Sequence, residues 1–189
     1  TGEVRTRWGG RMMVHPVTGE EVPDPEDQKA IYRYLNAQET EWPKADYVVS
    51  NPPFIGNKRM RFHLGDGYTD ALRKSYVEDV PISSDYVMYW WSKAANITQK
   101  KVYKRFGFIT TNSLTQVYNR QIIEKYLSSK KPLSLDFAIP DHPWVDGIDG
   151  AAVRISMTVC SPGEEKGKLW LLKSEKLTDS GGFHIEFQQ

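Results

Sequence analysis

Residues 45–60, ADYVVSNPPFIGNKRM, decide how the rest of the chain is interpreted. The stretch ADYVVS (45–50) is apolar and β-branched and lies between Pro43 and Pro52, which predicts a short buried strand. Consecutive prolines cannot continue a strand's hydrogen-bond ladder or enter a helix interior, and each holds the preceding residue in extended geometry. We therefore expect residues 51–54 to form a rigid turn at the carboxyl end of this strand.

Periodic apolar residues on both sides of this turn predict an α/β fold. Upstream, prolines and glycines punctuate residues 1–45, and a short helix is expected around 27–35. Downstream we expect helices at 70–76, at 85–101 after a Ser84 and Asp85 cap, and at a stripe of Tyr118, Ile122, Ile123, Tyr126 and Leu127 that ends before Pro132. Further strands are expected at 106–113, 133–139, 151–160 and 168–173. This order predicts a mixed sheet with parallel early strands, antiparallel last strands and helices on both faces.

Composition limits the classes of protein that fit. The 189 residues are enough for one domain, and 25 Lys and Arg against 24 Asp and Glu leave a net charge of +1, which favours no particular partner. A single cysteine excludes an internal disulfide framework, and four scattered histidines predict no metal site. This cysteine content makes the cytoplasm the expected compartment. No apolar run is long enough to span a membrane, so a soluble chain is expected. The chain begins at Thr1 without methionine, which predicts a piece of a longer polypeptide.

The rigid turn suits chemistry on a planar amine. An exocyclic amine is a poor nucleophile because its lone pair is delocalised, and two acceptors that take both of its hydrogens can localise that pair. The Asn51 side-chain oxygen and the Pro52 carbonyl are candidate acceptors, held in place by the fixed proline backbone. Phe54 offers a flat face for the heterocycle, and base–aromatic stacking is worth about 1–3 kcal/mol.

Three quoted segments carry a resemblance to a known family. EWPKADYVVSNPPFIGNKRM (41–60), SSDYVMYWWSKAA (83–95) and GFITTNSLTQ (107–116) resemble the adenine-specific DNA methyltransferases of bacterial restriction–modification polypeptides. The similarity extends over roughly residues 31–160. It implies a Rossmann-like methyltransferase fold, S-adenosylmethionine as cofactor and double-stranded DNA as substrate, with methyl transfer to N6 of a flipped adenine.

The same resemblance implies roles for individual residues. Asn51 and Pro52 are expected to bind the amine, Pro53 to stiffen the turn and Phe54 to stack on the base. Asn112 and Ser113, within TTNS (110–113), match the next strand-end motif, which helps shape the base pocket.

The chain departs from the family pattern where the cofactor site should be. That site depends on a glycine-rich turn after the first strand and an acidic residue ending the second, and residues 1–50 contain neither. We therefore expect a partial methyltransferase fold, with a lead-in at 1–45, a catalytic-side half at 46–175 and a tail at 176–189 leading toward a target-recognition region. Asn51 remains a candidate cofactor contact. Alone, the chain is expected to bind S-adenosylmethionine weakly or not at all and to be inactive. An upstream segment, a downstream recognition domain and a fused or separate endonuclease are the expected partners.

Several residues have two interpretations. Lys58, Arg59 and Arg61 are either phosphate contacts or solvated surface charges, and Asn112 and Ser113 are either pocket residues or a helix cap. At least one of Trp90 and Trp91 is expected in the core. Residues 139–150, which include Trp144, are either a plain surface loop or a flap near the substrate.

Other functions also fit the motif. The amine could belong to guanine in RNA or to a protein glutamine, the turn could merely end a strand, or the chain could be a non-catalytic DNA-binding fragment.

Overall fold

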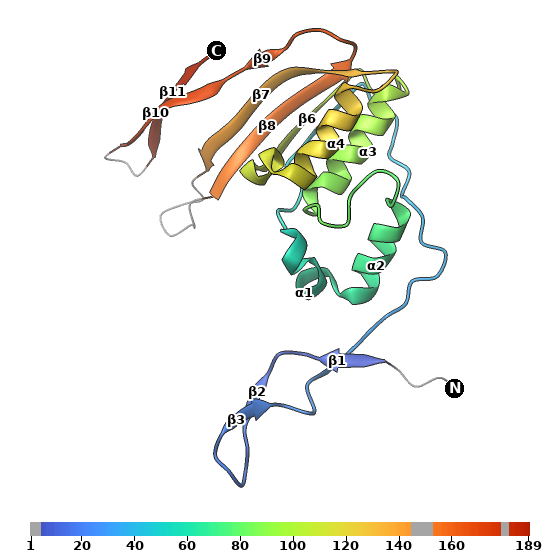
Figure 1. The fold of residues 1–189 in the computed structure, drawn as a ribbon, viewed down its shortest axis with the longest axis vertical. Helices are drawn as coiled ribbons and strands as arrows, with labels where there is room; N and C mark the ends of the chain where they lie inside the picture. Colours follow the sequence, from blue (N-terminus) through green and yellow to red (C-terminus); the bar gives the residue numbers. More distant parts are fainter. Residues whose placement is uncertain (1–4, 145–152, 179–181) are drawn as a thin grey trace.

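The computed structural model describes residues 5–144, 153–178 and 182–189 (Figure 1). The amino-terminal elements are β1 (Thr6–Trp8), β2 (Met12–Val14), β3 (Glu21–Pro23) and β4 (Gln28–Ala30). The central elements are β5 (Tyr47–Ser50), the 3-10 turn η1 (Asn57–Arg59), α1 (Met60–Leu64), α2 (Asp66–Ser75), α3 (Val87–Gln99), β6 (Arg105–Thr111), the 3-10 turn η2 (Asn112–Thr115), α4 (Val117–Leu127), β7 (Leu133–Trp144) and β8 (Val153–Pro162). The last elements are β9 (Lys168–Leu169), β10 (Leu171–Leu177) and β11 (Phe183–Gln188).

A five-stranded mixed sheet in the order β5-β6-β8-β7-β9 confirms the predicted fold class. β5 and β6 are parallel, while β8 lies antiparallel to both of its neighbours, β6 and β7. β9 differs from the expectation for the last strands because it runs parallel to β7. The segment between β8 and β9 turns around the start of β7, where the Gly163 N–H donates to Pro132 and the Glu165 N–H donates to Ser134, so the chain returns along β7's outer edge in the same direction.

Helices α3 and α4 lie together against one face of the sheet (Figure 1). Trp91 is fully buried there, packs edge-on against Phe106 and donates from Nε1 to the Thr158 hydroxyl at 3.1 Å. The expectation that at least one of the paired tryptophans is core is therefore confirmed. Trp90 is only partly buried and stacks on Trp42.

The opposite face of the sheet is open among the described residues, which corrects two expectations. Helices were expected on both faces, and residues 45–50 were expected to be buried. Instead Tyr47 is 63% exposed and Val49 86% exposed, and with Phe137 and Val159 they line a shallow apolar hollow. β5 is the strand at one edge of the sheet, and no described element packs on its face opposite α3 and α4, so the side chains on that face remain exposed.

Two details of the helices also differ from the sequence expectation. Ser84 does not cap α3, because its hydroxyl donates to the carbonyl of Tyr118 at 3.4 Å. Tyr86 occupies the cap position, and its side chain makes no capping hydrogen bond to the helix. Tyr118 is 54% exposed because it lies in the first turn of α4, whereas Ile122, Ile123 and Tyr126 are buried as the stripe predicted.

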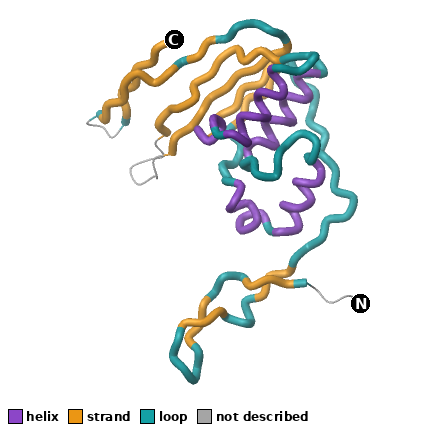
Figure 2. The backbone as a smooth tube through the Cα atoms, viewed as in Figure 1, coloured by secondary structure: helices purple, strands orange, loops and turns teal. Residues whose placement is uncertain are grey.

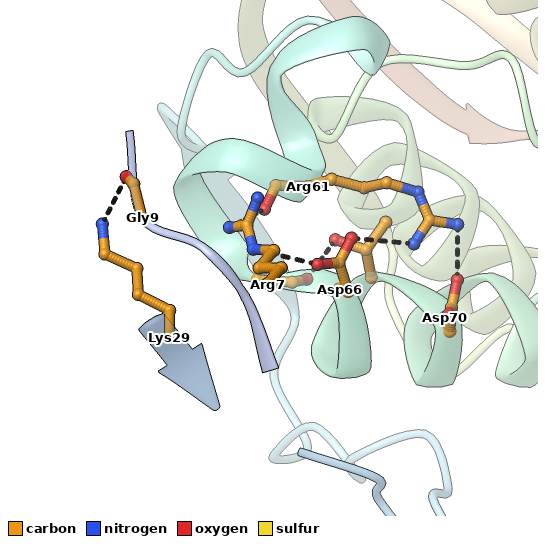
Figure 3. A network of polar contacts seen from close by, with 8 residues as sticks. Arg7, Gly9, Lys29, Arg61, Asp66 and Asp70 are labelled. Carbon is orange, nitrogen blue, oxygen red and sulfur yellow. Dashed lines mark hydrogen bonds and ion pairs between the residues drawn. The ribbon is translucent and has the colours of Figure 1, made fainter. Parts of the chain in front are cut away.

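Residues 5–30 form an arm of two small two-stranded sheets that extends from the body (Figures 1 and 2). The helix expected around 27–35 is wrong, because β4 pairs antiparallel with β1 instead. The arm is fastened to the helical region by Arg7, whose Nε lies 3.0 Å from Asp66 and whose Nη2 donates to the Arg61 carbonyl at 3.2 Å (Figure 3).

The carboxyl-terminal part is more regular than the sequence indicated. β7 continues through Trp144, so the excursion expected at 139–150 does not begin at 139, and its residues 145–150 lie outside the described residues. β10 and β11 pair as an antiparallel ribbon, and the expected tail at 176–189 therefore contains the end of β10 and all of β11. None of the helices in the described residues is long and apolar enough to cross a membrane.

Candidate active site

The NPPF turn (residues 51–54) and the TTNS segment (residues 110–113) come together at one edge of the sheet. β5 and β6 are parallel, with Ser50 opposite Phe108, so both strands run toward that edge. Asn51 follows β5 directly, and Asn112 and Ser113 follow the last residue of β6. This is the edge at which α/β sheets present their ligand sites.

Burial alternates along the NPPF turn. Asn51 and Pro53 are exposed, Pro52 is buried and Phe54 is half-buried. Pro52 thus anchors the turn, while the Asn51 amide makes no hydrogen bond with any other residue that the structure describes. Phe54 borders a cleft of about 690 Å³ and a smaller hollow of about 220 Å³ that it shares with Ser113. The ring therefore lies beside open space.

The residues after the NPPF turn are held by the segment that precedes α3. The Tyr86 N–H donates to the Ile55 carbonyl at 2.9 Å, and the Asn57 N–H donates to Oδ1 of Asp85 at 2.8 Å. The course of the chain from 55 to 57 is therefore set by the start of α3.

Asp85 also contacts the TTNS segment. Its Oδ2 accepts hydrogen bonds from the Ser113 hydroxyl at 2.6 Å and from Nδ2 of Asn119 at 3.0 Å. Asn119, buried on α4, accepts the backbone N–H of Asp85 on its own Oδ1 at 3.0 Å. Sequence reasoning missed this role of both residues. An acid just before an apolar helix has the same pattern as a helix cap, and Asn119 gave no signal of its own.

Asn112 faces a different group from its neighbour Ser113. It is exposed, and its Nδ2 donates to Oδ1 of Asp141 at 3.4 Å. The Arg154 guanidinium, 2.6 Å from the same oxygen, lowers the pKa of Asp141 from its ordinary value. The cap interpretation of Asn112 and Ser113 is wrong, because α4 begins after Gln116 and has no side-chain cap.

The three candidate phosphate-binding cations are not equivalent. Lys58 and Arg59 are exposed, line the large cleft beside Phe54 and form no ion pair within the part of the chain that the structure describes. Arg61 instead pairs with Asp70 at 2.7 Å and with Asp66 at 3.2 Å, and these hydrogen bonds raise its pKa (Figure 3). Arg61 is thus occupied in holding α1 to α2, and Lys58 and Arg59 are the cations available to a ligand.

The donor atoms at this edge suit an organic ligand. Across residues 5–144, 153–178 and 182–189, no three or more His, Cys, Asp or Glu side chains are grouped so that they could hold a metal ion. The ring of Phe54 and the two cations provide instead an apolar face and positive charge around one cleft, and the exposed Asn51 amide lies three residues before Phe54 in the same turn.

Comparisons with known proteins identify the family and the fold. A family model described as the DNA-methyltransferase domain of MmeI matches residues 14–171. Among solved structures, the type IIL restriction–modification enzyme MmeI in complex with DNA matches with a TM-score of 0.54 and 23% sequence identity. That match covers 75% of this chain and 18% of the enzyme, and it confirms the fold. A comparison with curated proteins found no match. The family model matches most of the length of this chain. The chain therefore belongs to the family of MmeI DNA-methyltransferase domains.

Proposed function

We propose that this chain forms the amine-binding side of an S-adenosylmethionine-dependent DNA methyltransferase that acts on N6 of a flipped adenine. The observation that carries the proposal is the exposed Asn51 amide, next to the buried Pro52, at the sheet edge where Phe54 borders a cleft of about 690 Å³. Family membership supports DNA as the substrate class. The choice of an exocyclic amine rests on the chemistry of the NPPF turn.

In this proposal Asn51 and Pro52 prepare the amine for attack. The side-chain oxygen of Asn51 and the carbonyl of Pro52 each accept one hydrogen, which draws the nitrogen toward tetrahedral geometry and localises its lone pair. S-adenosylmethionine, when bound, supplies an electrophilic methyl group on a sulfonium. On transfer, the N–CH3 bond would form as the S–CH3 bond breaks, leaving a neutral thioether. The two fixed oxygens would stabilise the positive charge that develops on the nitrogen, which would then release one proton to water.

Phe54 and the two cations would hold the substrate. N6 of a stacked adenine is out of reach of an enclosed site, so the base must leave the duplex, and the ring of Phe54 can stack on it for about 1–3 kcal/mol. Lys58 and Arg59 line the same cleft and suit contacts with the flanking phosphates.

The proposal extends to the cofactor and to the partner segments. Residues 1–50 contain no glycine-rich turn after an apolar strand. We therefore propose that most cofactor contacts come from a segment outside residues 1–189. Target reading would come from a separate recognition module, and DNA cleavage from a fused or separate endonuclease. Residues 1–189 alone should then bind S-adenosylmethionine weakly or not at all. Micromolar affinity in a calorimetric titration would contradict this part of the proposal.

The test uses the native polypeptide that carries these residues, tritiated S-adenosylmethionine and separate DNA, RNA and protein substrates. We expect label in DNA and N6-methyladenine in its digest. Asn51→Ala should lower the rate about 100-fold or more, by analogy with the loss of one preorganised polar group, while DNA binding persists. Gln121→Ala, an exposed amide on α4, is the matched control and should leave the rate unchanged.

Three results would redirect the proposal. Full activity of Asn51→Ala would reject the proposed mechanism. Label confined to RNA or protein would favour guanine or glutamine as the substrate. DNA binding without transfer to any substrate would favour a non-catalytic DNA-binding module.

A further inference from the structure

The Asp85 carboxylate is the point at which three separate segments meet. Oδ1 accepts the Asn57 backbone N–H at 2.8 Å, and Oδ2 accepts the Ser113 hydroxyl at 2.6 Å and Nδ2 of Asn119 at 3.0 Å. Asn57 lies just after the NPPF turn, Ser113 ends the TTNS segment and Asn119 belongs to α4. One side chain therefore fixes the distance between the two motifs that border the smaller hollow beside Phe54.

The Asp85–Asn119 pair is a two-point contact. Asn119 donates from Nδ2 to the Asp85 carboxylate, and its Oδ1 accepts the Asp85 backbone N–H at 3.0 Å. Asn119 is 3% exposed and also donates to the Ser113 carbonyl at 3.0 Å. The buried amide thus orients Asp85 from behind and holds Ser113 at the same time.

The contacts require a group that only accepts hydrogen bonds. All three partners of the carboxylate are donors, and an ionised carboxylate offers about four acceptor sites and no donor. An amide in its place would present an NH₂ group to either the Ser113 hydroxyl and Asn119 Nδ2, or to the Asn57 N–H. Charge-assisted hydrogen bonds are also shorter and roughly twice as strong as neutral ones, in keeping with the 2.6 Å contact to Ser113.

We propose that Asp85, oriented by Asn119, is a positioning residue for methyl transfer: it holds the NPPF turn and the TTNS segment in the register at which Asn51 and Phe54 grip the same base. The proposal rests on the proposed function. Asp85 itself touches neither the amine nor the methyl group. Its effect passes through the Asn57 N–H on one side and the Ser113 hydroxyl on the other, while the Tyr86 N–H to Ile55 carbonyl bond supplies a second, charge-independent attachment.

The first experiment measures position without activity. Amide hydrogen exchange of Asn57 in residues 1–189 is compared between wild type, Asp85→Asn, Asn119→Asp and the double exchange. We expect Asp85→Asn to speed Asn57 exchange about 10- to 100-fold, the effect of losing a hydrogen bond to a charged group, with the interior of α3 still protected. The double exchange returns a carboxylate to the cluster and should restore part of the protection. Asp79→Asn, which removes a partly buried carboxylate paired with Lys125 on α4, is the matched control and should leave the exchange of Asn57 unchanged.

The second experiment measures catalysis in the native polypeptide. Asp85→Asn should lower kcat at least tenfold with little change in KM for DNA, and the double exchange should recover part of kcat. If the role of Asp85 were purely structural, Asp85→Asn and the control Asp79→Asn would lower stability and kcat to the same extent. Unchanged Asn57 exchange, unchanged kcat or an equal loss of kcat in Asp79→Asn would each overturn the proposal. If the wild type transfers no methyl group to any substrate while Asp85→Asn still speeds Asn57 exchange, the proposed function is rejected and the role of Asp85 in holding the two motifs together stands.

Discussion

Replacing Thr158 by valine should destabilise the protein because it removes the acceptor of a buried indole. Trp91 is fully buried, and its Nε1 donates to Oγ1 of Thr158 at 3.1 Å across the interface between α3 and the sheet. Valine has nearly the same shape as threonine, so no cavity forms and the indole N–H simply loses its partner. A buried donor left unsatisfied costs about 1–3 kcal/mol.

Thr98 provides a matched control within α3. It is also fully buried, but its Oγ1 has no hydrogen-bond partner in the described structure. On folding, this hydroxyl loses its hydrogen bonds to water and gains none within the protein. Thr98→Val should therefore be neutral or stabilise the protein by up to about 2 kcal/mol. The two substitutions make the same chemical change, but only Thr158→Val is expected to destabilise the protein.

Urea unfolding of residues 1–189 measures both effects. Thr158→Val should lower the midpoint without changing the slope, since the surface exposed on unfolding stays the same. In a thermal scan the loss corresponds to about 2–4 °C for each kcal/mol in a chain of this size. In a Trp91→Phe background, which lacks the donor, Thr158→Val should cost much less. Equal effects of Thr158→Val and Thr98→Val would refute the assignment of this hydrogen bond as a stabilising contact between α3 and the sheet.

Three further outcomes are expected. Lys58→Ala and Arg59→Ala should each reduce the slope of log affinity for DNA against log salt by about 1 in the native polypeptide, and an unchanged slope would remove them from the phosphate contacts. Burial raises the pKa of Tyr126 to about 12, so the stability contributed by its neutral form is complete below the unfolded value of about 10 and is lost as pH rises through the folded value. Tyr126→Phe should therefore make the decline of the urea midpoint between about pH 10 and 12 shallower, and an identical decline would contradict the assignment. Arg7→Ala should expose residues 5–30 to faster trypsin cleavage with little change in Tm, because the Arg7 contact with Asp66 is partly exposed; Lys44→Ala is the control, and equal cleavage rates would show that Arg7 does not fasten the arm.

Helices α3 and α4 and the inner strands could be predicted because one physical rule decides them, whereas the short α1 was not predicted. The apolar spacing of α3, α4 and β6 follows from packing on the helix-covered face, where these elements share one hydrophobic core. The position of the NPPF turn was equally accessible, since prolines fix the strand end by themselves. Burial of β5 was not predictable, because it depends on whether another element covers the sheet.

Contacts between distant residues explain the other differences. The helix expected around 27–35 gave way to pairing between β4 and β1, which lie 22 residues apart at the Thr6–Gln28 contact. The role of Asp85 depends on donors 28 and 34 residues away, at Ser113 and Asn119. The sequence around Asp85 does not indicate these partners. A helix cap and a hydrogen-bond cluster between distant segments use the same residue types. Only the three-dimensional fold shows which of the two a given Asp or Asn forms.

The strand β8 reverses the usual relation between polarity and tolerance to mutation. Its small polar residues Ser156 and Thr158 are buried, and Thr158 accepts a hydrogen bond from Trp91 of α3, while the apolar Met157 and Val159 line the open face. A saturation mutagenesis scan of residues 1–189 should therefore find that hydrophilic replacements are accepted at Met157 and Val159, and that even a modest gain in volume is rejected at Ser156. Any hydropathy-based ranking of these positions would place them in the opposite order.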